Sequence, residues 1–456
     1  MASGGLQQLD ELVRLITAKV QEVKVEYAKV GQPLPTLDDA VNYPLDTQHT
    51  SQQLFNSIRA IQGACAQLSA LVAPPQRTVI SYAMNHTVAS SLSVAVRVEI
   101  ADHLKDHPDG LSVSQLAALT KINENKLSRI LRVLATKHCF KEVSPNVFAN
   151  NRLSMVLTSD NNLPALAALM YDDFTVSDEG LKAGAQLYEA LSDPAMGSSD
   201  ANNQTAFNLA FNHSGTLWEY FAKVDPARGR RFERAMTGLG EFIKFDAILH
   251  DFPWDQLPAG TSICDVGGGV GHVVMHLALT FKQLNVVLQD QPHTIEQAKR
   301  IWAEKAADVL KAGRARLEPI DFTQDVPVRD CDFYFIKHVI HNWSDEASKK
   351  ILTNVRKAMK PSSRLLIRIE ECIMPYASRE GQDTDNISQA PSPLLPNYGE
   401  GGFVPYAMDI LMMNVINSRE RTLDEYNALG KYAGFDLVKV WHCEETDILE
   451  YKLASA

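Results

Sequence analysis

Apolar side chains near the start of the chain recur every three or four positions, which is the period of a helix with one buried face. The first stripe consists of Leu6, Leu9, Leu12, Val13, Ile16 and Val20, and the second consists of Leu54, Phe55, Ile58 and Ile61. Prolines at positions 33, 35 and 44 predict a loop between the two helices, and Pro74-Pro75 ends the second helix. Two hypotheses for the apolar faces are equally favoured: they dock on a partner, or they dock on the protein's own domain.

Residues 94–150 carry the pattern of a winged helix. Ser112 and Gln115 have the spacing of a capping box at the start of one helix, and Asn123 is placed to cap the next helix. That second helix has an apolar stripe and is followed by two short strands, CFKEV and VFAN, around a turn. A winged helix either reads DNA, here with residues 124–138 as the recognition helix, or serves only for packing.

From residue 261 onward, short apolar runs alternate with helical stretches. The runs with a strand-like pattern are TSICDVGGG, NVVLQD, RLEPIDF, CDFYFIKHVI and RLLIRIEECI. This alternation predicts an α/β domain with a parallel sheet, helices on both faces and a ligand site at the carboxyl ends of the strands. We therefore expect a helical arm over residues 1–80, a winged-helix domain with further helices over 81–240, and the α/β domain over 241–456.

Composition narrows the partners that this organisation allows. The chain has 456 residues, of which 44 are basic and 55 are acidic, and its net charge is −11. Binding to nucleic acid needs a basic footprint, so the acidity argues against nucleic acid and favours the packing hypothesis for the winged helix. Six cysteines without a CxxC pair, no signal peptide and no apolar run near the ~18 residues of a membrane span predict a cytoplasmic protein without membrane contact.

The motif DVGGGVG at residues 265–271 directly follows an apolar run and opens a helix. It is not a dinucleotide fingerprint, because His272 stands where the third glycine would be, and no Gly-Lys-Ser/Thr follows it as in a phosphate loop. Asp265 would repel a pyrophosphate but suits a cationic ligand, and Asp290 ends the next strand, where an acid grips two ribose hydroxyls. A cationic nucleoside without phosphates describes S-adenosylmethionine. The alternative is a capping carboxylate beside a tight turn.

Several motifs, in the same order, resemble those of the cation-independent O-methyltransferases, which are the plant caffeate-type enzymes and their fungal relatives. Besides the glycine loop, they are QDQPH (289–293), IDF (320–322), KHVIHNWSDE (337–346), IEECIMP (369–375), RERT (419–422) and the helical stretch LWEYFAKVDPARGRRFERAM. The resemblance covers about residues 80–456 and is nearer to the fungal branch, which suggests secondary metabolism. It implies a winged-helix dimerisation domain before a Rossmann-like domain with a mostly parallel seven-stranded sheet, in an intertwined homodimer.

The resemblance also implies roles for residues of this chain. The cofactor-binding set contains Asp265, Gly267, Gly269 and Gly271 at the glycine loop, Asp290 at the ribose, Asp321 and Phe322 at the adenine, and Lys337 nearby. His341 matches the general base, Glu371 the first acid that flanks it and Glu420 the second. No metal is implied. Asn342 departs from the family, in which aspartate usually follows the histidine, and this weakens one acid but leaves the triad intact.

These residue types suit methyl transfer to a phenol. A phenol has a pKa near 10, so a histidine that acts as a base near neutrality helps to form the nucleophilic oxygen. A carboxylate on the other ring nitrogen fixes the tautomer and stabilises the imidazolium. The alternative for His341 is a packed histidine before Trp343. The predicted walls of the substrate pocket are Phe232, Met236, Met412 and Met413, and core packing is the alternative for the first two.

We therefore expect an O-methyltransferase that acts on a phenolic or enolic hydroxyl of a small natural product. The alternative is a methyltransferase-like pericyclase, in which Lys337 and His341 hydrogen-bond a substrate carbonyl during dehydration, Diels–Alder or Alder-ene chemistry. A third hypothesis, a winged-helix regulator, is disfavoured by the presence of His341, Glu371 and Glu420. The segment 377–404 lacks periodicity, and a lid and a surface insertion are equally favoured for it.

Overall fold

The computed structural model describes residues 2–161, 164, 179–242, 247–374 and 387–455. The chain divides into two compact units, neither of which is one continuous stretch. Unit 1 comprises residues 1–48, 64–244 and 413–417, and unit 2 comprises residues 49–63, 245–412 and 418–456. The boundaries at residues 80 and 240 that the sequence suggests stay predictions. Among the described residues, no helix combines the length and the apolar character that crossing a membrane requires.

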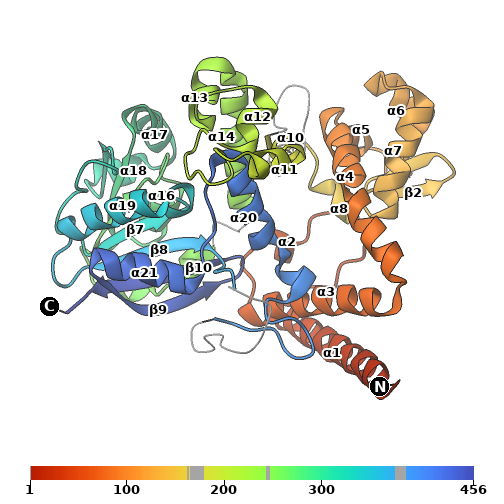
Figure 1. Ribbon diagram of the computed structural model, residues 1–456, viewed down its shortest axis with the longest axis horizontal. Helices are drawn as coiled ribbons and strands as arrows, with labels where there is room; N and C mark the ends of the chain where they lie inside the picture. The colour runs from red at the N-terminus through yellow and green to blue at the C-terminus, as the bar shows by residue number, and fades with distance from the viewer. Residues whose placement is uncertain (1, 162–163, 165–178, 243–246, 375–386, 456) are drawn as a thin grey trace. The chain divides into compact units, whose positions relative to one another are not determined.

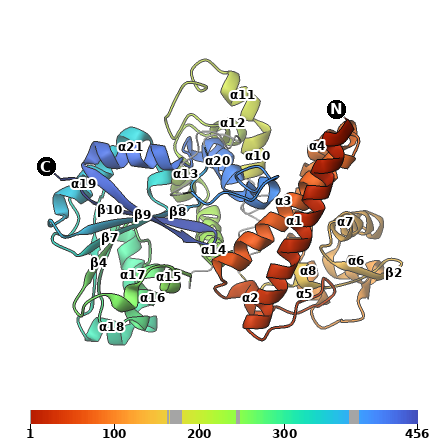
Figure 2. The same cartoon turned by 90° about the horizontal axis from the view of Figure 1, so that it is seen from below.

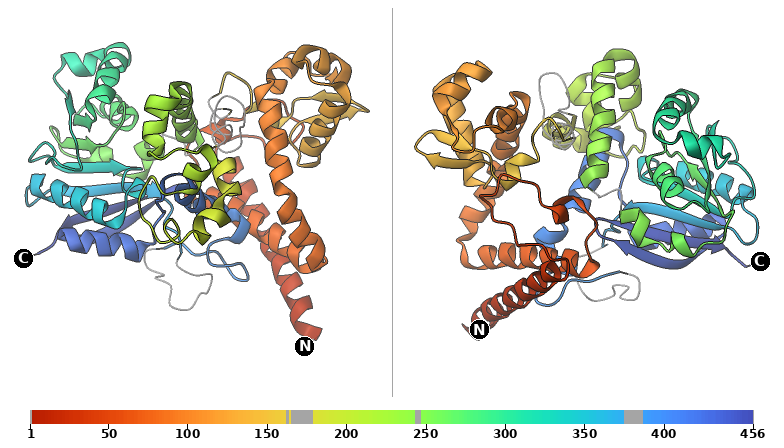
Figure 3. Two further views of the ribbon diagram at one scale, coloured as in Figure 1. Left: turned by 45° about the horizontal axis from the view of Figure 1, so that its top comes forward. Right: turned by 180° about the vertical axis from the view of Figure 1, so that it is seen from behind.

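Unit 1 starts with three long helices and one short helix. The long ones are α1 (Ala2–Lys29), the second part of α3 (Gln52–Val72) and α4 (Pro75–Arg97), and the short one is α2 (Pro44–Thr47). Both predicted helices are confirmed, and Leu12 of the first apolar stripe is fully buried. Pro44 is the first residue of α2, where its missing N–H has no partner to lose. The long helix α4 (Figure 3) escaped prediction because its apolar residues are not confined to one face.

The predicted winged helix is present in unit 1 (Figure 2). Its elements are α5 (Ile100–Leu104), β1 (Leu111–Ser112), α6 (Val113–Thr120), α7 (Glu124–Thr136), β2 (Lys141–Ser144) and β3 (Val147–Ala149), with the strands antiparallel in the order β1-β3-β2. The capping box is confirmed, because Ser112 and Gln115 bond each other's backbone N–H groups at 3.3 and 2.9 Å. Asn123 caps α7 by accepting a bond from the N–H of Lys126.

The other described elements of unit 1 are helices. They are α8 (Arg152–Met155), α10 (Glu179–Ala185), α11 (Leu187–Ser192), α12 (Ala206–Phe211), α13 (Leu217–Glu219), the π-helix η1 (Tyr220–Val224) and α14 (Pro226–Phe242). Asp225 directly precedes α14, and its Oδ1 accepts a hydrogen bond of 3.0 Å from the N–H of Arg228 in the first turn of that helix. The last residues of α20 (Phe403–Ile416) also belong to this unit.

Unit 2 contains the predicted α/β sheet (Figure 1). Its seven strands are β4 (Ser262–Val266), β5 (Asn285–Asp290), β6 (Ala315–Pro319), β7 (Phe333–Lys337), β8 (Arg364–Glu370), β9 (Phe435–Cys443) and β10 (Thr446–Leu453). They lie in the order β6-β5-β4-β7-β8-β10-β9, and β10 alone runs antiparallel to both of its neighbours. The parallel strands end at one edge of the sheet, and the strand order reverses beside β4. This reversal is where such sheets bind ligands.

Alternate side chains of each strand point to opposite faces of the sheet. Apolar side chains point to both faces, and helices cover each of them. One buried cluster joins the strands to α19 (Asp345–Ala358) and α21 (Leu423–Ala433), and it includes Tyr334 and Ile336 of β7. The other includes Phe335 of the same strand. This second cluster joins the sheet to α15 (Ile248–Asp251), α16 (His272–Thr280), α17 (Pro292–Lys305) and α18 (Ala307–Lys311).

The first part of α3 packs within unit 2 against the segment that precedes α20. Contact with the short helix η5 (Gly399–Gly402) and its neighbours is so close that a Cβ on Gly63 would lie 2.1 Å from the carbonyl oxygen of Tyr398. A Cβ on Gly401 would lie equally close, 2.1 Å, to the carbonyl oxygen of Arg59. Within the predicted 377–404 segment, residues 377–386 lie outside the described residues, and the described remainder contains the buried Leu394 and Tyr398.

Candidate active site

The loop after β4 has the backbone conformation that its glycines predict. Gly267, Gly269 and Gly271 have φ values of +74°, +60° and +83°, and residues that carry a Cβ rarely adopt such backbone angles. A Cβ on Gly267 would lie 2.7 Å from Val339, so this position has no room for one. Beside Gly269 no described atom lies within 4 Å of the Cβ position. The loop is therefore tightly packed at one end and open at its middle glycine.

Asp290, at the end of β5, is fixed beside this loop. Its Oδ2 accepts a hydrogen bond of 2.8 Å from the N–H of Gly269, and its Oδ1 accepts one of 2.7 Å from the N–H of Gln291. The two bonds hold the carboxylate at the edge of the sheet, next to the glycine loop. Asp290 therefore lies beside the glycine loop, and its predicted role at the ribose stays a prediction.

Asp265 is a buried acid with an unsatisfied oxygen. The residue is 2% exposed, and its Oδ1 has no hydrogen-bond partner among the described residues. Burial raises the pKa of Asp265 to about 7, while the cation of Lys337 lowers it and the carboxylate of Asp290 raises it further. A buried carboxylate with a free lone pair is suited to a cationic ligand.

Asp321 and Phe322, which were predicted to contact the adenine, lie in the turn after β6, and Phe322 also lies close to the glycine loop. A Cβ on Gly267 would lie 3.3 Å from the ring of Phe322, so this ring adjoins the loop. Phe322 also packs edge-to-face with Trp343, with ring centroids 6.3 Å apart. Asp321 accepts hydrogen bonds from the N–H and hydroxyl of Thr323 at 3.0 and 2.6 Å, which fix its carboxylate within the turn.

His341 and Glu420 form a close pair. The ring nitrogen Nδ1 of His341 lies 2.7 Å from Oε1 of Glu420, and the side chains are 11% and 2% exposed. His341 lies on the short helix η4 (Ile340–Asn342) after β7, and Glu420 lies in the loop after α20. The structure therefore brings together the predicted base and the second of its two predicted acids.

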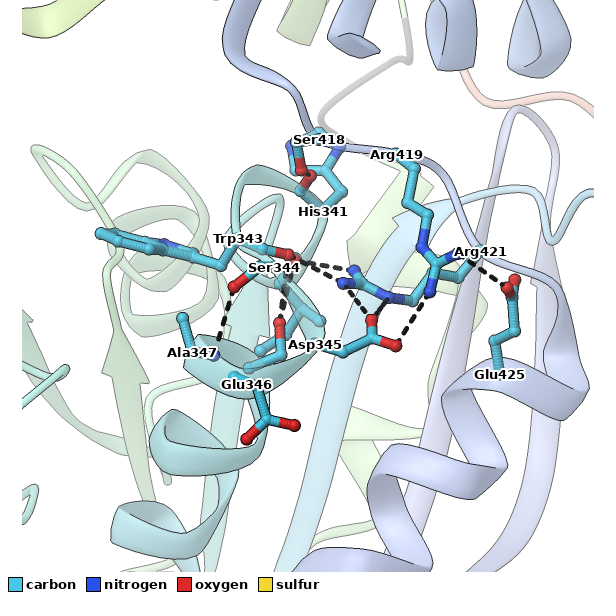
Figure 4. Close-up of polar contacts among 12 residues, drawn as sticks. His341, Trp343, Ser344, Asp345, Glu346, Ala347, Ser418, Arg419, Arg421 and Glu425 are labelled. Carbon is cyan, nitrogen blue, oxygen red and sulfur yellow. Dashed lines mark hydrogen bonds and ion pairs between the residues drawn. The ribbon is translucent and has the colours of Figure 1, made fainter. Parts of the chain in front are cut away.

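A buried arginine connects the two loops that carry this pair (Figure 4). Arg421 is 1% exposed and donates hydrogen bonds to the carbonyl oxygens of Ile340 and Trp343 at 2.9 and 2.7 Å. Its Nε and Nη2 also donate to Oδ1 of Asp345 at 3.1 and 2.9 Å. The hydroxyl of Ser418, which lies in the same loop as Glu420, donates a hydrogen bond to the carbonyl oxygen of His341. These contacts fix the position of the Glu420 backbone relative to His341.

Glu371, the first of the two predicted acids, is bound by an arginine that the sequence did not single out. Both of its carboxylate oxygens pair with Arg59 of α3, at 3.0 Å from Nη1 and 2.6 Å from Nη2. Burial raises the pKa of Glu371, and the guanidinium of Arg59 counteracts that effect.

Residues 188–436 match the O-methyltransferase domain, and residues 80–160 match the O-methyltransferase dimerisation domain. The chain belongs to the O-methyltransferase family. The family resemblance, the α/β fold and the enzyme class that the sequence predicted are thereby confirmed. The cofactor of this O-methyltransferase is S-adenosylmethionine, and the similar solved structures include forms with that cofactor or its demethylated product.

Relatives of this O-methyltransferase span nearly its whole length. It is 37% identical over 444 residues to 3-O-methyltransferase 2 of Phanerochaete chrysosporium, with 97% of each chain covered. It is 31% identical to O-methyltransferase tpcA of Aspergillus fumigatus, over 96% of this chain and 94% of that one. The solved structure of CalO1, a methyltransferase in calicheamicin biosynthesis, is 26% identical and covers 84% of this chain and 100% of its own, with a TM-score of 0.63. LepI bound to the cofactor, at 19% identity, 89% and 95% coverage and a TM-score of 0.66, shares the fold.

The predicted substrate walls stay predictions for this O-methyltransferase. Phe232 and Met236 are half-buried on α14, and the Phe232 ring packs against those of Trp218 and Phe221, each with centroids 5.4 Å away. Met412 is buried and Met413 half-buried on α20. Phe232, Met236 and Met413 belong to unit 1, whereas Met412 belongs to unit 2.

Proposed function

We propose that this O-methyltransferase methylates a phenolic or enolic hydroxyl of a small natural product, with His341 as the general base. The observation that carries the proposal is the buried 2.7 Å contact between His341 and Glu420. An ionised Glu420 can only accept a hydrogen bond, so it favours the tautomer with the proton on Nδ1. Nε2 is then left as a proton acceptor, and Glu420 stabilises the imidazolium that forms when the substrate hydroxyl gives up its proton.

The cofactor-binding role of the glycine loop is part of the same proposal. When bound, S-adenosylmethionine supplies a methyl group activated by a positively charged sulfur. The open space at Gly269 and the unsatisfied Oδ1 of Asp265 fit such a cation. Gly267, Gly271, Asp290 and the Asp321–Phe322 pair complete the proposed site, and Lys337 tunes Asp265 from the end of β7.

We propose that the methyl acceptor is a hydroxyl oxygen of a secondary metabolite. The names of the fungal relatives support this, among them sterigmatocystin 8-O-methyltransferase of Aspergillus parasiticus, which is 27% identical over 424 residues. A pericyclase remains the second candidate. The structural likeness to LepI is compatible with it but concerns the fold alone.

The deciding experiment uses S-adenosylmethionine with a labelled methyl group and a panel of small phenols and enols. Methyl transfer predicts labelled product and one equivalent of S-adenosylhomocysteine, and His341→Ala should abolish both. A cyclised or dehydrated product that forms without S-adenosylhomocysteine would support the pericyclase and contradict the proposed base.

We also propose a cytoplasmic homodimer. The dimerisation-domain match over residues 80–160 supports self-association, as do apolar side chains exposed on α4 within unit 1. These side chains are Val79, Ile80, Tyr82 and Met84. The six cysteines are all free thiols, which supports a reducing compartment. Light scattering on the purified chain would test the dimer, and a fluorescent fusion in cells would test the location.

A further inference from the structure

Asp409 of α20 bonds the backbone of the acid that contacts the proposed base. Its Oδ1 accepts a hydrogen bond of 2.9 Å from the N–H of Glu420, which follows 11 positions later in the chain. Oε1 of Glu420 in turn lies 2.7 Å from Nδ1 of His341. All three residues belong to unit 2. Two direct contacts therefore lead from α20 to the ring of His341.

The helix that carries Asp409 is itself fixed at the edge where the parallel strands end. Tyr406 lies three positions before Asp409 on α20, and its hydroxyl accepts a hydrogen bond of 3.0 Å from the N–H of Met374, in the segment after β8. Residues three positions apart lie on the same side of a helix. One side of α20 thus holds two backbone N–H groups, that of Met374 and that of Glu420.

The carboxyl groups of Asp409 and Glu420 are close enough to interact electrostatically. Burial raises the pKa of Asp409, the N–H of Glu420 lowers it, and the negative charge of Glu420 raises it. Arg419 lowers the same pKa and Glu425 raises it. A carboxyl group can accept a hydrogen bond in its ionised and in its protonated form. The contact with the Glu420 backbone therefore needs an acceptor oxygen at position 409 but not a charge.

Loss of this acceptor would displace the chain at Glu420. The residue is 3% exposed, so its backbone N–H has little access to water. A buried N–H without an acceptor is costly, and the chain would move until the group finds another one. The carboxylate of Glu420 would move with its backbone, and a misplacement of about 1 Å can cost about 100-fold in rate.

We propose that Asp409 is a positioning residue for methyl transfer, which fixes the Glu420 carboxylate against Nδ1 of His341 by holding the Glu420 backbone. This inference rests on the proposed function. It connects the base to α20, the helix that also carries Met412, a predicted wall of the substrate pocket. One helix would then hold both the substrate and the acid that serves the base.

The kinetic test compares Asp409→Leu, Asp409→Asn, Glu420→Gln and the double variant Asp409→Leu/Glu420→Gln in the full chain. We expect Asp409→Leu, which has the size of aspartate but no acceptor, to lower kcat about 10- to 100-fold. KM for S-adenosylmethionine should stay near the wild-type value. Asp409→Asn, whose amide oxygen accepts the same bond, should keep kcat within about threefold of the wild type. In the Glu420→Gln background, Asp409→Leu should lower kcat by less than about twofold, because the carboxylate that it positions is already gone.

A spectroscopic readout needs no substrate. The Nδ1 proton of His341, held 2.7 Å from a carboxylate, should give a proton NMR signal at low field that is lost in His341→Ala. His442 makes an equally short contact of 2.7 Å with Asp447 and provides an internal reference. Asp409→Leu should shift or weaken the His341 signal and leave the His442 signal unchanged, whereas Asp409→Asn should leave both in place.

Asp332 provides the matched control for effects on folding. It directly precedes β7, at the opposite edge of the sheet, and its Oδ2 accepts a hydrogen bond of 2.8 Å from the N–H of Ser262. It also pairs with Lys360 at 2.7 Å. Asp332→Leu should therefore lower the unfolding temperature at least as much as Asp409→Leu, but leave kcat and both low-field signals unchanged.

Three results would overturn the inference. They are a wild-type kcat and His341 signal in Asp409→Leu, a loss of kcat in Asp409→Asn as large as in Asp409→Leu, and an effect of Asp409→Leu that is undiminished in the Glu420→Gln background. If Asp409→Leu does not fold, Asp409→Ala, which favours the helix, replaces it in every comparison. A wild-type protein that transfers no methyl group contradicts the proposed function instead, and the His341 signal still decides whether Asp409 positions the pair.

Discussion

Arg421 donates two hydrogen bonds to a single oxygen of Asp345, and so joins the loop that carries Glu420 to the helix that follows His341. The same guanidinium donates to two backbone carbonyl oxygens around η4. The pairing of base and acid therefore depends on a residue that is neither. This gives the RERT motif a physical role, since the buried arginine fixes where its glutamate lies.

Arg421→Met should reduce both stability and turnover. It removes charge-assisted hydrogen bonds from a residue that is 1% exposed, for an expected loss of about 2–3 kcal/mol in the free energy of unfolding. Arg419→Met is the control, because Arg419 also pairs with Asp345 but its side chain is 46% exposed, and the expected loss is less than about 1 kcal/mol. Urea denaturation and kcat would be measured for both variants. Equal losses would show that Arg421 has no special role.

Glu420→Gln should lower kcat and leave the affinity for S-adenosylmethionine largely unchanged. The amide keeps the size of the side chain but has no negative charge to stabilise the imidazolium. General-base catalysis contributes about 10²–10⁴-fold to the rate, which sets the upper limit of the loss in kcat. Single-turnover methyl transfer and calorimetric titration of the cofactor separate the two effects. If cofactor affinity falls in parallel with kcat, Glu420 belongs to the cofactor site.

Affinity for the cofactor should fall as the pH drops below about 7, the pKa to which burial raises Asp265. A cation favours ionised Asp265, so binding at low pH must expel a proton, and the affinity should fall by up to about tenfold per pH unit. Calorimetric titration at pH 6, 7 and 8 checks this. Asp265→Asn should bind more weakly, with a flat profile, and an equally steep profile in that variant would assign the proton to another group.

The same shift predicts a pH dependence of stability without cofactor. The folded state holds the Asp265 proton more tightly than the unfolded state, in which the pKa is near 3.8. The stabilisation is therefore complete below about pH 4 and is lost as the pH rises through about 7. Asp265→Asn should remove this component from a plot of the free energy of unfolding against pH.

Gly269→Ala should impair cofactor binding more than stability. The Cβ would enter open space, so the folded chain bears only the strain of φ +60°, about 1–2 kcal/mol. Gly313 offers a matched control, since its φ is +68° and its Cβ position is equally open. Gly313→Ala should lose similar stability with unchanged cofactor affinity. Similar affinities in the two variants would mean that the loop does not line the cofactor.

Local signals predicted much of this molecule. The capping box at Ser112, the cap of α7 at Asn123 and the strand that leads to the glycine loop each depend on residues a few positions apart. The sequence did not predict which residues far apart along the chain come into contact. The motifs marked His341 and Glu420, but nothing in their spacing shows that residues 79 positions apart lie 2.7 Å from each other.

Arg59 marks the limit of sequence reasoning for this fold. It is separated from Glu371 by 312 positions, and it lies in a helix whose apolar stripe predicts only that one face is buried. A lone arginine on such a helix is ordinary in sequence, and only the tertiary fold gives it a partner. The helix α4 was missed for a different reason, since its apolar residues do not form a single stripe.

The strand order has a consequence for how the sheet is assembled during synthesis. β10 (Thr446–Leu453) is synthesised after both β8 and β9, yet it lies between them and pairs with both. Until residues 446–453 emerge, the edges of β8 and β9 have no strand between them, and exposed edges invite pairing with other chains. The nascent chain must therefore keep an incomplete sheet from aggregating until β10 has been made.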